Sequence, residues 1–349
     1  MYLKDLVDIQ MGQSPDSKFY NNDKIGLPFY QGKADFGRIN PIPKIWCSKS
    51  KKEAKPNDIL ISVRAPVGDL NINNEQSCIG RGLAAITCKS DVDMMYLYYH
   101  LKYLKPQLRH ISTGSTFESI NRSQLENLNI DYKPYLEQIK ISNILQVVQR
   151  QIEVREKLLR LYDLLIKSRF VEIFKNNKAH IAIGELFQVI DGDRGKNYPK
   201  ATDFFDEGDC LFLNAKNVTK NGFCFDTVQF ITQQKDEQLN KGRVLPEDII
   251  LTTRGTVGNI AYCDIKSSHK HMRINSGMVI LRSKDIIYDV DFITYVLSNQ
   301  INYGKEISGS AQPQLPISKL KDIMIPFPEI FLQKDFGYLI KQINKLKFA

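Results

Sequence analysis

The sequence predicts an α/β protein in which two pseudo-repeated α/β domains are separated by long antiparallel, coiled-coil-like helices. Two observations lead to this prediction: similar blocks of residues occur twice in the same order, and an uninterrupted helical pattern lies between the two copies. A period this long indicates duplicated domains rather than a solenoid of short repeats. We therefore expect one domain at residues 1–133, a central helix at 134–176, a second domain at 177–328 and a short helix at 329–349 that packs on the central helix.

Four blocks carry the internal similarity. Residues 3–12 resemble 183–192, residues 27–33 resemble 210–216, and the stretch from 111 to 130 resembles that from 307 to 325. The remaining block is the most specific, because residues 56–68 and 246–258 are identical at six of thirteen positions. The spacing between copies changes along the chain, so the loops between blocks differ in length.

Each copy mixes strands and helices. Short apolar runs with proline before and glycine after, at residues 58–63 and 248–253, predict buried strands, and the runs at 83–87 and 278–282 predict strands in the same way. Apolar residues at helical spacing predict helices at 92–108 and 290–301. Each domain is therefore expected to be α/β, with loops that differ between the copies.

The segment from about Tyr135 to Phe174 contains neither proline nor glycine. Its apolar residues recur at alternating steps of three and four, which predicts a helix of about 40 residues, or about 60 Å at a rise of 1.5 Å per residue. Such a stripe must be buried against another helix. An antiparallel pair with the C-terminal helix, expected from Glu329 to Lys347, is the simplest arrangement. The residues of the stripe are Leu145, Val148, Ile152, Leu159, Tyr162, Ile166 and Ile173.

Composition indicates a soluble, basic protein. The hydrophobic fraction is 42%, the charged fraction is 25%, and the net charge of +9 with a pI near 9.0 favours a polyanionic partner such as nucleic acid. No apolar run is long enough to cross a bilayer, and the start of the chain lacks the pattern of a signal peptide. The six cysteines are scattered, which argues against a disulfide framework or a zinc site. We expect a cytoplasmic protein without a membrane or metal partner.

The motifs of enzymes that act on DNA are missing from the sequence. The Asn-Pro-Pro-aromatic signature of adenine methyltransferases does not occur, and the segment at Gly192 lacks the spacing and the hydroxyl of a phosphate-binding P-loop. Acidic residues near the predicted strands do not form the converging carboxylate set that two-metal cleavage of DNA needs. We expect no catalytic residue, although a DNA endonuclease or methyltransferase with an unrecognised active site remains the alternative.

The duplicated domain, the long helix between the copies and the second helix after the latter copy together resemble the specificity (S) subunits of type I restriction–modification systems. The block at 56–68 and 246–258 is similar to a marker of that family, and the similarity in order and spacing covers nearly the whole chain. The resemblance implies two target-recognition domains that each read one half of a split, asymmetric site on double-stranded DNA. It also implies that the helices set the gap between the half-sites.

The resemblance further implies partners and excludes cofactors. Modification subunits, which bind S-adenosylmethionine and methylate adenine, would dock on the helices. Restriction subunits, which use ATP and Mg²⁺, would cut the DNA. The S subunit itself would carry no cofactor. If the readers bind one face of the duplex, the half-site centres lie about 34–36 Å apart, one helical turn.

Two arginines shared by both copies are candidates for DNA contact. Arg64 and Arg254 are expected at the ends of strands, where they could reach a phosphate or grip a guanine. The alternative is a recurrent salt bridge to Asp58 and Asp248. Because a residue common to both readers cannot explain different target sequences, phosphate contact or a structural role is favoured over base reading.

Positions where the copies differ are better candidates for reading bases. Amide side chains pair with adenine and lysine pairs with guanine, but these residues could equally belong to surface loops. Serines in two Gly-Ser turns could offer backbone N–H groups to phosphate, although helix capping is the commoner reason for such turns. The candidates are Gln31, Lys33, Asn214, Lys216 and Asn217 for bases and Ser115 and Ser310 for phosphate.

The C-terminal helix is about half as long as the central helix, whereas the two are comparable in the family. We therefore expect the central stripe from about Leu159 to Ile173 to lack a partner within the chain, and a modification subunit or a second chain to cover it. A third interpretation is a coiled-coil adaptor, which would bind DNA without sequence preference.

Overall fold

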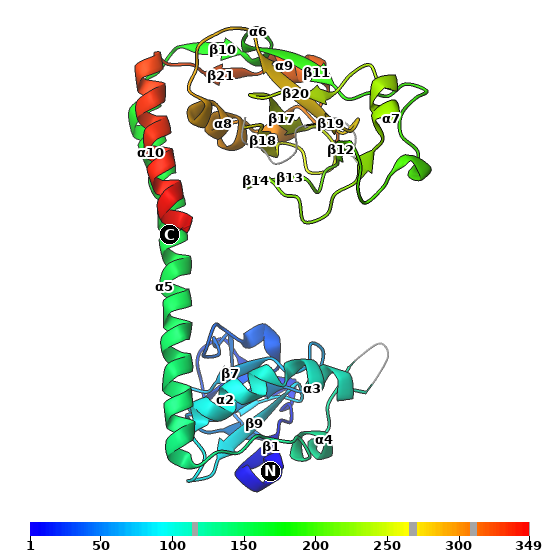
Figure 1. The fold of residues 1–349 in the computed structure, drawn as a ribbon. Coiled ribbons are helices and arrows are strands. Elements are labelled where there is room, and N and C mark those ends of the chain that lie inside the picture. Colours follow the sequence, from blue (N-terminus) through cyan, green and yellow to red (C-terminus); the bar gives the residue numbers. More distant parts are fainter. Residues whose placement is uncertain (114–117, 265–270, 308–312, 349) are drawn as a thin grey trace. The chain divides into compact units, whose positions relative to one another are not determined.

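The computed structural model describes residues 1–113, 118–264, 271–307 and 313–348. Contacts divide the chain into two compact units, Met1–Glu156 and Lys157–Ala349, called unit 1 and unit 2 below. One continuous helix, α5 (Tyr135–Phe174), belongs to both (Figure 1). It has the bounds that the sequence predicts, because a run of this length without proline or glycine leaves the helical hydrogen bonds unbroken.

Unit 1 is built on two sheets. A four-stranded antiparallel sheet has the order β1-β9-β6-β7, and a five-stranded sheet has the order β2-β4-β3-β8-β5 with one parallel pair, β3 with β8. Its strands are β1 (Val7–Met11), β2 (Tyr20–Asn21), β3 (Leu27–Tyr30), β4 (Ile45–Cys47), β5 (Glu53–Ala54), β6 (Ile59–Ser62), β7 (Leu70–Ile72), β8 (Ser77–Ile79) and β9 (Leu83–Cys88). Its helices besides α5 are α1 (Leu3–Leu6), η1 (Ser17–Phe19), η2 (Lys33–Asp35), α2 (Met94–Tyr103), α3 (Lys105–Ile111) and α4 (Arg122–Glu126).

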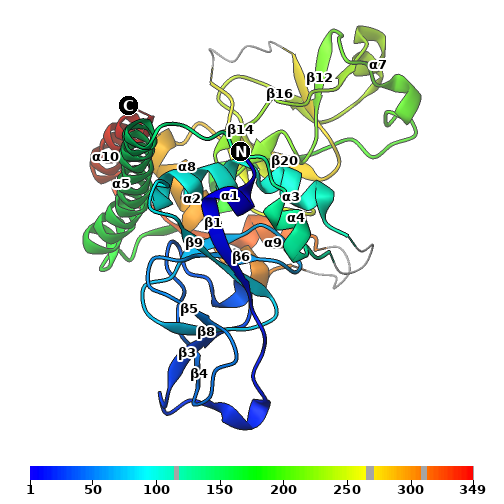
Figure 2. The ribbon, with the colours of Figure 1, turned by 90° about the horizontal axis from the view of Figure 1, so that it is seen from below.

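The four-stranded sheet of unit 1 lies between the helices and the five-stranded sheet (Figure 2). Alternation along β6 explains this layering, because successive side chains of a strand point to opposite faces. Ile59 and Ile61 pack with Leu97 and Leu101 of α2. Leu60, between them, packs with residues of β3 and β8. The fully buried run predicted at 58–63 is therefore a strand covered on both faces.

Unit 2 repeats this plan. Its four-stranded sheets have the orders β11-β20-β17-β18 and β15-β12-β19-β16, and two-stranded pairs join β10 to β21 and β13 to β14. Its strands are β10 (His180–Ala182), β11 (Phe187–Asp191), β12 (Cys210–Leu213), β13 (Val218–Thr219), β14 (Gly222–Phe223), β15 (Phe230–Ile231), β16 (Arg243–Val244), β17 (Ile249–Thr252), β18 (Ile260–Tyr262), β19 (Met272–Ile274), β20 (Met278–Ser283) and β21 (Met324–Pro326). Its helices are α6 (Ile183–Leu186), η3 (Ala201–Asp203), α7 (Gln233–Gln238), α8 (Val290–Asn299), η4 (Tyr303–Lys305), α9 (Ile317–Asp322) and α10 (Ile330–Phe348).

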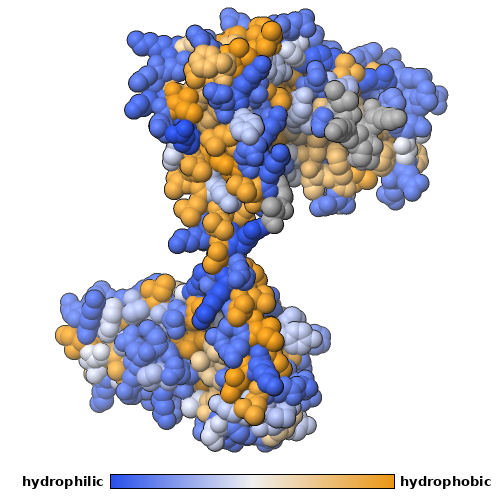
Figure 3. Space-filling model, turned by 60° about the vertical axis from the view of Figure 1, so that its left-hand side comes forward, coloured by the Kyte–Doolittle hydropathy of each residue, from blue (hydrophilic) through white to orange (hydrophobic). Residues whose placement is uncertain are grey.

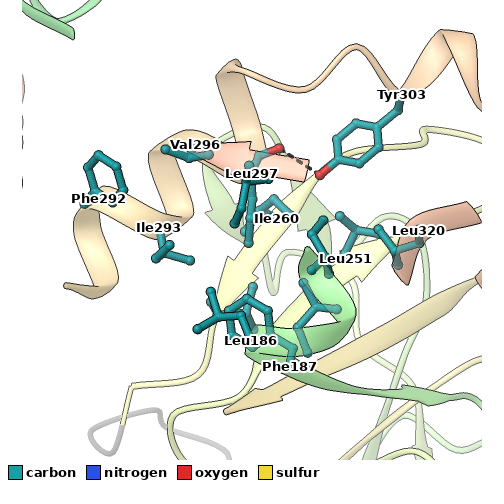
Figure 4. Packing of buried hydrophobic residues seen from close by; sticks show 14 of the residues in the cluster. Leu186, Phe187, Leu251, Ile260, Phe292, Ile293, Val296, Leu297, Tyr303 and Leu320 are labelled. Atoms are coloured by element: carbon teal, nitrogen blue, oxygen red, sulfur yellow. Dashed lines mark hydrogen bonds between the residues drawn. The ribbon is translucent and has the colours of Figure 1, made fainter. Parts of the chain in front are cut away.

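The helix side of unit 2 forms its largest apolar core. Phe292, Ile293 and Val296 of α8 pack with Leu251 of β17, and the Tyr303 hydroxyl, buried beside them, donates to the Leu297 carbonyl at 2.9 Å (Figure 4). Burial raises the pKa of the Tyr303 hydroxyl, so this group stays a neutral hydrogen-bond donor. The apolar spacing predicted at 290–301 thus faces the sheet.

The strand registers confirm the duplication residue by residue. Ile59 pairs with Ile86 in unit 1, and Ile249 pairs with Leu281 in unit 2. The registers of the other strands place Glu53, Cys78 and Thr87 of unit 1 where unit 2 has Arg243, Arg273 and Arg282. This correspondence agrees with the sequence alignment of the blocks and extends it to positions whose residues differ.

Two buried glutamines anchor the long helices in the same way. In unit 1 the Gln138 Oε1 atom accepts from the backbone N–H of Asp93 at 2.9 Å, and in unit 2 the Gln333 Oε1 atom accepts from that of Asp289 at 3.1 Å. Each aspartate in turn caps the helix that it begins, α2 or α8. The start of α10 is therefore the counterpart of the start of α5.

Helix α10 runs antiparallel to the C-terminal part of α5 (Figure 1). Phe336 of α10 lies 5.4 Å from Phe170 and 5.6 Å from Phe174 between ring centroids. Further along α10, Lys347 bonds to Asp163 at 2.5 Å. Residue numbers rise along α10 as they fall along α5, so the expected antiparallel pair is confirmed.

The part of α5 that α10 leaves uncovered is not the part expected from the sequence. The expectation of an unpartnered stripe from about Leu159 to Ile173 is wrong, because Tyr162, Ile166 and Ile173 pack in the core that α10 shares. The reason is topological: α10 follows β21, which pairs with β10 just after α5, so α10 starts beside the C-terminal end of α5. Exposed apolar residues occur in both parts of the helix: Leu164, Leu165 and Val171 are exposed in the later part, and a longer run is exposed earlier, at Ile144, Leu145, Val147, Val148, Ile152, Val154, Leu158 and Leu161. Apolar side chains along the helix are visible in Figure 3.

Candidate nucleic-acid interface

The two shared arginines follow equivalent strands but differ in surroundings. Arg64 follows Val63 after the end of β6, in the segment that leads to β7, and its side chain is exposed. Arg254 comes after β17 and is half-buried, and its Nε atom finds no hydrogen-bond partner among the described residues. A buried N–H group without a partner costs about 1–3 kcal/mol, so a ligand that accepts from Arg254 would be favoured.

The salt bridge considered for these arginines does not form. Asp58 accepts from the Thr87 hydroxyl at 2.7 Å, and Asp248 accepts from Arg282 at 2.7 Å. Within the described ranges, neither aspartate is paired with the shared arginine of its block. Both carboxylates instead tie the strand that they begin to its neighbour in the sheet, which explains why they recur.

Gln31 and Lys33 follow β3 in unit 1, and both are exposed. Lys33 is not free, because its Nζ atom lies 3.0 Å from Asp69, which also binds Lys105 at 2.5 Å. Burial opposes ionisation of Asp69, but hydrogen bonds from Lys105 and Lys33 hold its pKa below the ordinary value. Lys33 would have to leave this ion pair in order to grip a base, whereas Gln31 would not.

The unit 2 candidates have separate roles. Asn217 is 0% exposed, and its amide accepts from the backbone N–H of Asn214 and donates to two backbone carbonyls, at 3.0 Å to Cys224 and 2.8 Å to Thr227. The side chain holds the loop together, and its expected contact with DNA stays a prediction that would require these hydrogen bonds to open. Asn214 is half-buried and accepts from the N–H of Lys216, while Lys216 itself is exposed. Ser115 and Ser310 lie outside the described residues.

A cleft in unit 2 gathers cationic side chains that the sequence analysis did not single out. It has a volume of about 740 Å³ and is lined by residues of α7, β11, β16, β19 and β20 and of the segment between α7 and β16. Four of its lining residues are cationic and two are acidic. We call it the arginine cleft; its charged residues are Lys241, Arg243, Arg273 and Arg282 with Asp236 and Glu237.

Buried ion pairs fix the geometry of the arginine cleft. The side chain of Arg273 is only 4% exposed, and its Nε donates to Asp236 at 2.6 Å. Arg243, 54% exposed, donates to the other oxygen of the same carboxylate. Arg282, 30% exposed, binds Asp248 through two nitrogens, at 2.7 and 2.9 Å.

The same contacts determine the charge states in the cleft. Burial opposes ionisation of Asp236, but hydrogen bonds from Arg273 and Arg243 hold its pKa below the ordinary value. The hydrogen bond to Asp236 raises the pKa of Arg243, and that to Asp248 raises the pKa of Arg282. The cleft therefore keeps its positive charge throughout the physiological pH range.

The equivalent place in unit 1 is acidic or neutral. Glu53 occupies the position of Arg243 and is bonded to the Ser50 hydroxyl and, at 2.6 Å, to the Gln76 amide. Hydrogen bonds from these two partners lower the pKa of Glu53. Cys78 and Thr87 occupy the positions of Arg273 and Arg282. Unit 1 thus offers no cluster of cations at this point of its fold.

Unit 1 instead presents lysines at one edge of its five-stranded sheet. The Nζ atom of Lys18 lies 5.2 Å from the ring centroid of Phe19, and that of Lys49 lies 5.7 Å from it. Lys24 lies 5.7 Å from the centroid of Trp46. Exposed lysines interleaved with aromatic rings are typical of surfaces that bind nucleic acid.

Both halves of the chain match one family model, described as the type I restriction modification DNA specificity domain, at residues 1–160 and 176–347. The chain belongs to this family. Each unit of the structure accordingly contains one copy of the specificity domain, and the strand registers described above relate the two copies.

The relatives with similar sequences carry names of one type. The chain is 45% identical over 150 residues to the type I restriction enzyme MjaX specificity subunit of Methanocaldococcus jannaschii, a match covering 43% of this chain and 35% of that protein. It is 24% identical to the MjaIX specificity subunit of the same organism, over 95% of this chain and 83% of the relative. The type I restriction-modification S subunit from M. genitalium has the same fold, with a TM-score of 0.62 at 18% identity over 99% of this chain and 89% of that one.

The described residues contain no group of three or more side chains suited to hold a metal ion and no helix long and apolar enough to span a membrane.

Similarity between the blocks does not reveal the arginines of the cleft, because they stand at positions where the two copies differ. A search for aligned positions with unlike charge would have found Arg243, because Glu53 and Arg243 both stand three residues before the proline of the same block.

Proposed function

We propose that this specificity-domain protein is the DNA-recognition subunit of a type I restriction–modification complex, in which each unit reads one half of an asymmetric bipartite site. The observation that carries the proposal is the presence of two specificity domains with matching strand registers and different residues at equivalent positions. Two similar readers with different surfaces require two half-sites of different sequence.

The second part of the proposal concerns the gap between the half-sites. A continuous helix such as α5 is stiff, whereas a linker rich in glycine and serine would let the distance fluctuate. A reader of this kind tolerates only one spacer length, because one added base pair moves the second half-site along the duplex and rotates it around the axis.

Partner subunits complete the proposed activity. Modification subunits with S-adenosylmethionine would methylate adenine in the site, and restriction subunits with ATP and Mg²⁺ would cut the DNA. The exposed apolar part of α5, between Ile144 and Leu161, supports docking of a modification subunit on this helix, because apolar area of this kind is stabilised by burial.

The test of DNA recognition begins with sequencing of methylated bases in the host genome, which yields the candidate motif. Binding of the purified chain to that motif is then compared with binding to the same halves separated by one base pair more or fewer. We expect loss of specific binding at either altered spacer, and no cutting or methyl transfer by the chain alone with Mg²⁺ and S-adenosylmethionine. Equal affinity for all spacers would refute the proposal.

Docking on α5 has its own test. Ile144→Asp and Val148→Asp place charges on one face of the helix and should abolish co-purification with the modification subunit while DNA binding by the chain persists. Asn143→Asp, at an exposed polar position of the same helix turn, is the matched control. Normal co-purification of both apolar variants would show that the partner binds elsewhere.

A further inference from the structure

We infer that the arginine cleft of unit 2 is a phosphate-binding site that takes one phosphodiester of the DNA backbone beside the half-site of this unit, and that unit 1 has no equivalent site. The inference rests on the proposed function and adds to it a contact that similarity between the two domains does not reveal. It depends on which N–H groups of the arginines are already used.

Two arginines at the cleft keep unused donors. Arg243 makes one side-chain hydrogen bond, through Nη2 to Asp236, which leaves its Nε and Nη1 groups without a partner among the described residues. Arg282 is held through Nε and Nη2, which leaves Nη1. Lys241 is exposed beside them. Guanidinium groups with free N–H groups favour phosphate oxygens, because their planar donors match the oxygens of one anion.

Arginines balance the charge of the two aspartates at the cleft. The two oxygens of Asp236 accept from Arg273 and Arg243, and those of Asp248 accept from Arg282 and from the backbone N–H of Leu245. Glu237 accepts from Gln233 at 2.9 Å and is exposed to solvent. The paired acids therefore orient the arginines, and the residues that line the cleft comprise four cations and two acids.

Asp236 is paired with two arginines, although one would be enough to neutralise its charge. Arg243 and Arg273 face each other across β16 and β19, and like charges directly opposite in a sheet are unfavourable. Buried Arg273 alone neutralises Asp236, so a neutral residue at position 243 would satisfy the sheet. An anionic ligand would explain the presence of Arg243, because it would balance the positive charge that Arg243 adds beside the Asp236–Arg273 ion pair.

The size of the cleft and the different residues at its place in unit 1 favour DNA as the source of the phosphate. A volume of about 740 Å³ is larger than one phosphate needs and accommodates the attached sugar as well. In unit 1, Glu53 replaces Arg243, and Lys51, the counterpart of Lys241, is paired with Asp16 at 3.1 Å. A site confined to one of two divergent readers suits a contact with one half-site only.

Arg243→Gln tests the inference in the full chain. Because a phosphate contact is lost, the slope of log affinity against log salt should fall by about 1, and affinity at moderate salt by about 10-fold. The loss should be the same for the correct and an altered sequence in the unit 2 half-site, since phosphate contacts carry no base information. Lys241→Gln should act in the same direction.

Controls separate this loss from misfolding and from general charge. Lys334→Gln removes one exposed cation of unit 2 on α10 and should leave the salt slope unchanged. The unfolding temperature of Arg243→Gln should stay close to that of the parent, because Arg273 still neutralises Asp236. Titration with inorganic phosphate tests whether the cleft binds free phosphate instead of DNA. If Arg243→Gln abolishes phosphate binding but leaves the salt slope of DNA binding unaltered, the cleft binds free phosphate and its role on DNA is overturned.

The inference fails separately from the proposed function. If the parent chain shows spacer-dependent specific binding and Arg243→Gln has the parent salt slope and affinity, the cleft is not a DNA contact. If the parent chain itself shows no specific binding, the proposed function fails first.

Discussion

Units 1 and 2 share strand registers, yet three equivalent positions of their sheets are acidic or neutral in unit 1 and cationic in unit 2. Glu53, Cys78 and Thr87 in unit 1 become arginines in unit 2, where they form a cleft stabilised by buried ion pairs. The aspartates at the start of β6 and β17 stay the same. Duplication has kept the residues that hold strands together and altered the charges around them.

The units also differ in how their cations are held. Unit 1 displays lysines over aromatic rings, with long flexible side chains at a sheet edge. Unit 2 holds arginines against carboxylates in a fixed geometry. The difference implies that unit 1 attracts the DNA backbone diffusely and that unit 2 places one phosphate at a defined point.

The largest difference is expected for Asp236→Asn against Glu53→Gln. Loss of the Asp236 charge leaves buried Arg273 without a counter-ion and should cost unit 2 about 3–5 kcal/mol of unfolding free energy. Glu53→Gln weakens hydrogen bonds only and should cost unit 1 about 1 kcal/mol. Calorimetry of the full chain would show a separate early transition for the first variant, and similar destabilisation by both would contradict the comparison.

A smaller contrast is expected at the shared aspartates. Asp248→Asn breaks a two-nitrogen contact with Arg282 and should cost about 3 kcal/mol, since hydrogen bonds between charged groups are the stronger kind. Asp58→Asn breaks a bond from the neutral Thr87 hydroxyl and should cost about 1 kcal/mol. Urea unfolding of each variant gives both values. Equal costs would mean that the arginine adds nothing to the aspartate of unit 2.

Asn217→Ala tests the assignment of this residue to the scaffold of unit 2. Removing the buried amide leaves the carbonyls of Cys224 and Thr227 unpaired and should lower unfolding free energy by about 2 kcal/mol. Lys216→Ala, the exposed neighbour, should change it by about 0.5 kcal/mol or less. A variant at Asn217 with normal stability and weaker DNA binding would restore its role as a reader.

The smallest expected effect is a dependence of the unfolding free energy on pH in the acidic range. The folded-state pKa of Asp236 lies below its ordinary value, so the unfolded chain binds more protons in acid and stability increases with pH. This contribution is complete above the ordinary value of about 3.9 and is lost as the pH falls from there through the folded-state pKa. The stability gap between the parent and Asp236→Asn should therefore narrow below about pH 4, which unfolding curves at pH 3 and pH 6 would reveal.

The duplicated architecture, the antiparallel helix pair and the extent of α5 could all be predicted from the sequence. These features depend on periodicity, on proline and glycine as breaks, and on similarity between blocks, all of which are properties of neighbouring residues along the chain. The strands β6, β9, β17 and β20 lie where the apolar runs predict them, because a run that is apolar at successive positions requires burial on both faces.

The accessibility of the polar side chains and the place where the helices meet depend on long-range contacts in the folded chain. Asn217 is as polar as any surface residue in the sequence, but a loop closes around it. The arginine cleft joins side chains from α7, β16, β19 and β20, which strand pairing brings together from distant parts of the chain. The covered part of α5 depends on β10 pairing with β21, a long-range contact that places the start of α10. Periodicity is local, whereas the surroundings of a side chain depend on such distant pairings.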